Sequence, residues 1–176
     1  MKFSKDSFTA VIRLATGHTQ GIEMPDKSDA VLYSDDYEEA YLKQILTDVK
    51  NIALIGASPK PERDSYLTME ALLKAGYTVF PVNPFEVGNS ILGQPCYASV
   101  TEIPHKIDMV DIFRSSEFVL AITDDAIAIG AQVVWMQLGI INLEARDNAI
   151  KANLKVVMNR CPKLELAKPY WISTLS

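Results

Sequence analysis

The stretch NIALIGASPKPERDS, residues 51–65, predicts the element around which the rest of the chain is organised. Ile52–Ile55 is an unbroken apolar run, typical of a strand buried on both faces, and Gly56 allows a sharp turn after it. Ser65 is the expected N-cap of a helix predicted over Tyr66–Lys74. A strand, a glycine turn and a helix N-terminus together present N–H groups and a positive dipole end, so this stretch predicts a phosphate site.

Strands and helices alternate along the rest of the chain. Apolar or β-rich runs predict strands at residues 77–82, 107–113, 132–137 and 155–158, with a short further strand at 96–100. Helical patterns run from Asp35, where Asp35 and Glu38 are placed as a capping box, from Ser116 to Gly130, and from Asn142 to Ala152. Residues 85–95 are expected to form a loop. The alternation predicts an α/β fold, a doubly wound and mostly parallel sheet of five to six strands with helices on both faces.

Length and charge limit the kinds of protein that this chain can be. At 176 residues it is expected to form one domain, residues 34–176, preceded by a partly ordered arm, residues 1–33, without a sustained period. With 17 basic and 22 acidic residues and a net charge of -5, it is not expected to bind nucleic acid. It shows no membrane-span pattern and no secretory signal pattern, so we expect a cytoplasmic protein.

The cysteines and histidines predict neither a metal site nor a catalytic centre. Cys96 and Cys161 are far apart and lack CxxC spacing, so reduced thiols are expected and no zinc site. Cys161 follows Arg160, which favours a reactive thiol, but most free cysteines are packing residues. His18 and His105 lie outside any glycine-rich loop, so no catalytic residue is predicted.

The candidate binding residues follow the predicted strands. In a parallel sheet a ligand binds outside the carboxyl ends of the strands, so these residues are expected to converge. They are Gly56, Ala57 and Ser58, then Asn83 and Pro84, then Phe113 and Arg114, and finally Gln137 and Gly139. Lys60 and Arg63 add two cations to the first loop, although they suit a solvated loop equally well. For Arg114 the alternative is an ion pair with Asp111 or Glu117.

Two features disfavour a dinucleotide such as NAD. In the G-x-G-x-x-G fingerprint counted from Gly56, the second and third glycines are replaced by Ser58 and Pro61. The following strand ends at Asn83-Pro84 without the acidic residue that would hold a ribose hydroxyl. Pro59 and Pro61 push the following helix later, so the first loop is expected to be wider than in NAD-binding proteins.

Together these motifs resemble the CoA-binding protein family, small stand-alone domains similar to the N-terminal domain of the succinyl-CoA synthetase alpha subunit. The resemblance covers residues 51–162 and is carried by Gly56-Ala57-Ser58, Pro59-Lys60-Pro61, Arg63, Gly76-Tyr77, Pro81-Val82-Asn83-Pro84, Val110-Asp111-Ile112-Phe113-Arg114, Trp135-Met136-Gln137-Leu138-Gly139 and Asn159-Arg160-Cys161-Pro162.

The resemblance implies a Rossmann-like domain that binds CoA or an acyl-CoA. Its diphosphate would lie near Gly56, Ala57 and Ser58, and its adenosine near the loop after Val82, at Asn83-Pro84. Lys60 and Arg63 would suit the 3′-phosphate that distinguishes CoA from NAD, and Ser65 would lie beside them.

The resemblance implies no catalytic residue, so a non-catalytic CoA-binding protein is expected, with a second copy or another protein as a partner. One alternative is the CoA-handling subunit of an acyl-CoA ligase or acyltransferase. The chain has no P-loop, so ATP would have to be handled by another polypeptide. The other alternative is an NAD(P)-binding regulator or oxidoreductase.

Overall fold

The computed structural model describes residues 37–172. A five-stranded sheet forms its centre, in the order β2-β1-β5-β6-β7, and every pair of neighbouring strands is parallel. The strands are β1 (Asn51–Ile55), β2 (Thr78–Val82), β5 (Met109–Ile112), β6 (Val133–Met136) and β7 (Lys155–Val157). The predicted doubly wound α/β fold is confirmed. The strand order reverses at β1, so the carboxyl ends of β1 and β5 flank the place where such sheets bind ligands.

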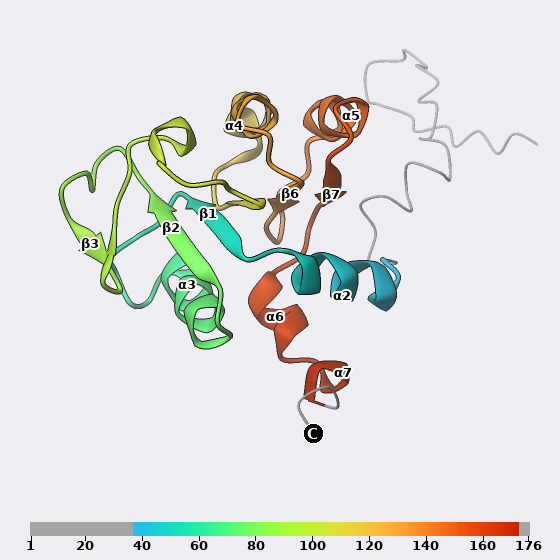
Figure 1. Cartoon of the computed structure of the whole chain (residues 1–176), viewed down its shortest axis with the longest axis horizontal. Helices are drawn as coiled ribbons and strands as arrows, with labels where there is room; N and C mark the ends of the chain where they lie inside the picture. The colour runs from blue at the N-terminus through green and yellow to red at the C-terminus, as the bar shows by residue number, and fades with distance from the viewer. Residues whose placement is uncertain (1–36, 173–176) are drawn as a thin grey trace, which may run out of the picture.

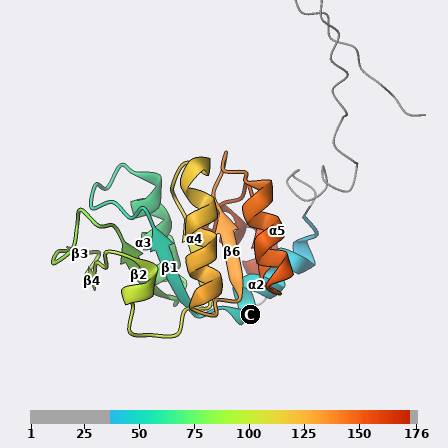
Figure 2. The same cartoon turned by 90° about the horizontal axis from the view of Figure 1, so that it is seen from above.

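Helices cover both faces of the sheet (Figures 1 and 2). On one face lie α4 (Ser116–Ala128) and α5 (Leu143–Lys151); on the other lie α2 (Glu39–Asp48), α3 (Asp64–Lys74) and α6 (Pro162–Leu166). Strand β1 shows why both layers are needed. Ile52 and Leu54 belong to the apolar cluster on the α2 and α3 side, whereas Ala53 and Ile55 belong to the cluster on the α4 and α5 side. Side chains alternate between the faces, so the whole apolar run is buried.

The structure corrects the sequence-based predictions at several ends of elements. Helix α2 has Glu38 as its N-cap, without a side-chain cap, so Glu38 is not the third helical residue of a capping box. The expected loop at residues 85–95 contains a hairpin of β3 (Ser90–Ile91) and β4 (Gln94–Pro95). Residues 96–100 give only one isolated bridge, between Tyr97 and Val82. The helices α6 and α7 (Pro169–Ile172) had no predicted counterpart.

The other predicted strands and helices are present in the structure. Asn142 caps α5 as expected, because its side chain accepts a hydrogen bond from the N–H of Ala145 at 2.9 Å. A short 3₁₀ helix at Val100–Glu102 leads into β5. No helix in the described part is long and apolar enough to cross a membrane. The predicted arm of residues 1–33 and Asp35 lie outside the described residues.

Candidate functional site

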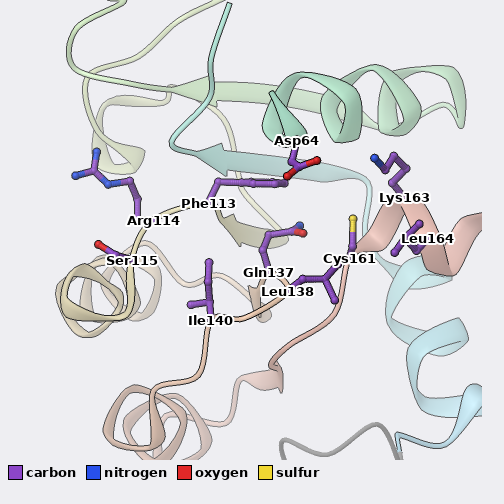
Figure 3. Close-up of a pocket in the computed structure, with 10 residues that line it drawn as sticks. All are labelled: Asp64, Phe113, Arg114, Ser115, Gln137, Leu138, Ile140, Cys161, Lys163 and Leu164. Atoms are coloured by element: carbon purple, nitrogen blue, oxygen red, sulfur yellow. The ribbon is translucent and has the colours of Figure 1, made fainter. Parts of the chain in front are cut away.

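Two adjoining cavities form a cleft at the carboxyl ends of the central strands. The first has a volume of about 370 Å³ and is lined by Gly56, Ala57, Ser58, Arg63, Asp64, Ser65, Asn83, Phe85, Phe113 and Arg114. The second has a volume of about 390 Å³ and is lined by Asp64, Phe113, Arg114, Ser115, Gln137, Leu138, Ile140, Cys161, Lys163 and Leu164 (Figure 3). Asp64, Phe113 and Arg114 belong to both walls, so the cavities lie side by side. Each has a size usual for small-molecule sites.

Gly56 is required by the approach of two strand ends. Its φ is +84°, and a Cβ at this position would lie 2.6 Å from the carbonyl oxygen of Phe113. An L-residue would therefore be strained in its backbone and would also press on the end of β5. The glycine lets β1 and β5 end close together at the floor of the cleft.

The N–H groups of Gly56 and Ala57 are bound within the sheet. Both donate to the carbonyl oxygen of Val82, at 2.9 and 3.2 Å. The residues line the first cavity as predicted, but these two amides hold the end of β1 against β2. Backbone donors for an anion must therefore come from Ser58 onward or from the start of α3.

Helix α3 begins two residues earlier than the sequence predicted, because its first residue is Asp64 and its N-cap is Arg63. Ser65 is inside the helix and buried, so the prediction that it caps the helix is wrong. The first intrahelical bond from this end is donated by the N–H of Leu67 to Arg63 at 3.1 Å. The preceding amides, those of Asp64, Ser65 and Tyr66, lack an intrahelical acceptor, as at any helix start. They provide the positive end that a phosphate needs, although the Asp64 carboxylate competes for it.

Asn83 connects the first two loops. Its side-chain nitrogen donates to the carbonyl oxygen of Ala57 at 2.8 Å, and its side-chain oxygen accepts from the N–H of Phe85 at 3.0 Å. Asn83 therefore fixes the shape of the first cavity. Phe85 follows with 87% of its surface exposed and lines the same cavity. The sequence reasoning had missed this aromatic residue.

Arg114 is available to a ligand. No carboxylate of residues 37–172 lies within salt-bridge distance of it, so the expected alternative of an ion pair with Asp111 or Glu117 is wrong. Its guanidinium lies over the ring of Phe118, 4.5 Å from the ring centroid. Figure 3 shows Arg114 at one end of the second cavity and Cys161 with Lys163 at the other. Arg63 likewise has no carboxylate partner in the described part.

Gln137 and Cys161 lie in the wall of the second cavity. Gln137 is buried and its side-chain nitrogen donates to Oδ1 of Asp111 at 2.6 Å. Cys161 precedes α6, and its sulfur lies 3.6 Å from the hydroxyl of Thr68. Leu138 and Leu164 are half exposed at the mouth of the cavity, at 54% and 50%.

The structure separates four predicted site residues from the walls of these cavities. They are Lys60, Val82, Pro84 and Gly139. Val82 is buried and takes part through its backbone, whereas the N–H of Gly139 donates to Asn159 at 2.8 Å. The wall residues that had not been predicted, Lys163 and Leu164 among them, come partly from α6. Pro162 at the first turn of a helix was the available sequence signal for α6. No group of three potential metal ligands was found among the described residues.

Comparison with known proteins places the chain in a family. A family model described as a CoA binding domain matches residues 50–167, which include all five strands and both cavities. The chain belongs to the CoA-binding domain family. The resemblance deduced from the sequence is thereby confirmed.

Relatives of this CoA-binding domain include both small proteins and parts of larger ones. It is 35% identical over 126 residues to the uncharacterized protein YneT of Bacillus subtilis, which covers 72% of this chain and 92% of YneT. A solved structure of a hypothetical protein from Pyrococcus horikoshii is 44% identical, with a TM-score of 0.71, over 76% of this chain and 93% of that one. The chain is also 35% identical over 95 residues to the alpha subunit of an ADP-forming acetate–CoA ligase of Pyrococcus furiosus, but this spans only 21% of that subunit.

Proposed function

We propose that the protein binds CoA or an acyl-CoA in the cleft and catalyses no reaction by itself. The observation that carries this proposal is the contrast between two adjoining cavities. The first combines Arg63, Arg114 and the start of α3. The second is walled largely by apolar side chains, Phe113, Leu138, Ile140 and Leu164. A phosphorylated nucleotide joined to a long and weakly polar arm matches this pair, and CoA is such a ligand.

The lining residues supply an orientation for CoA. Its diphosphate would lie between Ser58, the first amides of α3 and Arg114, where cations and N–H groups face one space. Its adenine would lie towards Asn83, with the exposed ring of Phe85 as a stacking surface. The pantetheine arm would then extend past Phe113 into the second cavity.

Arg63 is the best candidate for the 3′-phosphate of CoA. It lies in the first cavity, carries no ion pair in the described part, and has the fixed planar geometry that binds phosphate in a bidentate manner. Lys60 lies outside the wall and is exposed, so we assign it a weaker contribution by long-range attraction.

Thermal unfolding in the presence of ligands tests the proposal. CoA at 100 times its dissociation constant should stabilise the fold by about 2.7 kcal/mol. For a domain of this size that is a rise in Tm of roughly 5–10 °C. Dephospho-CoA, which lacks the 3′-phosphate, should bind about tenfold more weakly, and NAD should have little effect. In Arg63→Ala the difference between CoA and dephospho-CoA should largely vanish, while dephospho-CoA binds as before. Stabilisation by NAD and not by CoA would contradict the proposal and favour the alternative of an NAD(P)-binding protein.

A second candidate function is a CoA-handling subunit of an acyl-CoA ligase, which the similarity to the Pyrococcus furiosus ligase subunit favours. Because the chain matches only a fifth of that subunit, the remaining chemistry would require another polypeptide. The test is acyl-CoA formation from CoA, a carboxylic acid and ATP by the protein together with whatever copurifies with it. Turnover that requires a copurifying ATP-binding subunit would establish this role; CoA binding without such a subunit would leave the binding function alone.

A further inference from the structure

Asp111 is a buried acid in the strand next to the topological switch. It lies in β5 opposite Leu54 of β1 and Trp135 of β6, and none of its surface is exposed. Its Oδ1 accepts the hydrogen bond from Gln137, while Oδ2 has no hydrogen-bond partner in the described part of the chain. Burial raises the pKa of Asp111 from 3.8 to about 7. A carboxyl group in this place costs stability that an apolar side chain would not, which indicates a role at the neighbouring cavity.

The hydrogen bond to Asp111 determines which end of the Gln137 amide is free. In the structure the bond is made by the nitrogen Nε2, so the amide has its nitrogen turned towards Oδ1 of Asp111 and its oxygen turned away from it. No group of residues 37–172 donates to the amide oxygen Oε1. Gln137 is 4% exposed and lines the second cavity, where Figure 3 shows its side chain extending towards Cys161. The side chain therefore offers this cavity a hydrogen-bond acceptor that the protein does not use.

We propose that Asp111 is a positioning residue that holds Gln137 so that its amide oxygen accepts an N–H group of the ligand's arm. This inference rests on the proposed function, since the arm is the pantetheine part of CoA, whose two amides each carry an N–H. An unrestrained glutamine can turn its amide over and present either end, so it discriminates poorly between donors and acceptors. The ionised form of Asp111 has only acceptors and therefore removes this freedom. The second cavity thereby selects an amide N–H and would leave a group that can only accept, such as an ester oxygen, without a partner.

The test compares ligands with and without the relevant N–H. The probes are CoA, adenosine 3′,5′-bisphosphate, which lacks the arm, and two CoA analogues in which one or the other pantetheine amide is replaced by an ester. Their affinities are measured by calorimetry at a pH above about 7, where Asp111 is ionised, for the native protein, Gln137→Leu, Asp111→Ala and Asp111→Asn. Adenosine 3′,5′-bisphosphate serves as the control for folding, because its site lies in the first cavity.

In the native protein one of the two ester analogues should bind about tenfold more weakly than CoA, as expected for one lost hydrogen bond. In Gln137→Leu this difference in affinity should disappear, because CoA should then bind as weakly as that analogue. Asp111→Ala should reduce the difference in affinity between CoA and that analogue, although residue 111 does not touch the ligand. Asp111→Asn can offer Gln137 either its oxygen or its nitrogen, so it should keep the shape of the side chain but lose most of the difference in affinity between CoA and that analogue.

The outcomes separate this inference from the proposed function. If neither CoA nor adenosine 3′,5′-bisphosphate binds the native protein, the proposed function is wrong and the inference fails with it. If both bind but native protein and Gln137→Leu treat the ester analogues alike, the inference alone is overturned. Equal discrimination by Asp111→Ala and the native protein would overturn the role of Asp111.

Discussion

Replacing Gly56 by alanine tests whether the glycine is needed for the close approach of β1 to β5. The positive φ of +84° should cost an L-residue about 1–2 kcal/mol. The new Cβ would also lie 2.6 Å from the carbonyl oxygen of Phe113, where the obstacle is backbone and not the end of a flexible side chain. Relieving such a contact requires the two strand ends to separate, which should cost roughly 1–3 kcal/mol more. The expected loss of stability is therefore about 3 kcal/mol.

Gly139 supplies a matched control. Its φ is +75°, but no atom lies within 4 Å of a Cβ built on it. Gly139→Ala should therefore carry the conformational cost without the steric one, about 1 kcal/mol after the gain from a stiffer unfolded chain. Urea unfolding followed by circular dichroism measures the free energy of unfolding of both variants. In thermal unfolding, Tm should fall by roughly 6–12 °C for Gly56→Ala and by about 2–4 °C for Gly139→Ala.

Equal losses for the two variants would refute the reasoning, because the contact with Phe113 would then contribute nothing. If Gly56→Ala were as stable as the native protein, the ends of β1 and β5 would be able to separate without cost, and the reasoning would again be wrong. Because this substitution moves the carbonyl group at the end of β5, the affinity for CoA should fall further than in Gly139→Ala, measured on protein that is still folded.

Three further predictions concern separate parts of the molecule. Because the pKa of Asp111 is raised, the unfolded chain loses this proton near pH 4, whereas the folded protein keeps it until about pH 7. The stability that the protonated Asp111 gives the native protein is therefore full below pH 4 and is lost as pH rises towards 7. Relative to the native protein, Asp111→Asn should gain up to about 4 kcal/mol between pH 4 and pH 8 in urea unfolding, and a constant difference would contradict the shift. Bound CoA should slow alkylation of Cys161 at least about tenfold but leave the rate for Cys96 unchanged, because both residues are about equally buried, at 5% and 6% exposure, and only Cys161 lines the cleft. If mass spectrometry finds the same rate for Cys161 with and without CoA, the placement of the pantetheine arm is wrong. Asn142→Ala should lose about 1 kcal/mol and lower Tm by about 2–4 °C, because it removes the cap of α5, and an unchanged Tm would show that the cap is dispensable.

The sequence predicted the sheet well because its signals there are local. Ile52–Ile55 is apolar throughout, as is typical of a short strand covered by helices on both faces. Asn142 directly precedes a helical pattern and so marks the start of a helix. The chemistry at the strand ends followed from topology, since parallel strands bring Gly56, Phe113 and Gln137 to one edge. Nine of the thirteen predicted binding residues line the two cavities.

The errors arose where local signals compete or where a partner is distant. Arg63, Asp64 and Ser65 are consecutive polar residues, and two of them are good caps, so the first helical residue was ambiguous. The hairpin after β2 turns through Leu92 and Gly93, both at positive φ, and leucine is an unusual residue there. The bonds of Gly56 and Ala57 to Val82 depend on β2 lying beside β1, which no pattern within either strand reveals.

Those two bonds divide the first loop into parts with different freedom to evolve. The residues up to Ala57 hold β1 against β2, so a substitution there should lower the stability of the whole fold. Residues 58–62 make no backbone hydrogen bond to a strand of the described part, and all of them except the half-buried Ser58 are exposed. Substitutions among them should therefore alter the charge and width of the entrance with little loss of stability. A common scaffold can in this way acquire new ligand preferences by rewriting five positions.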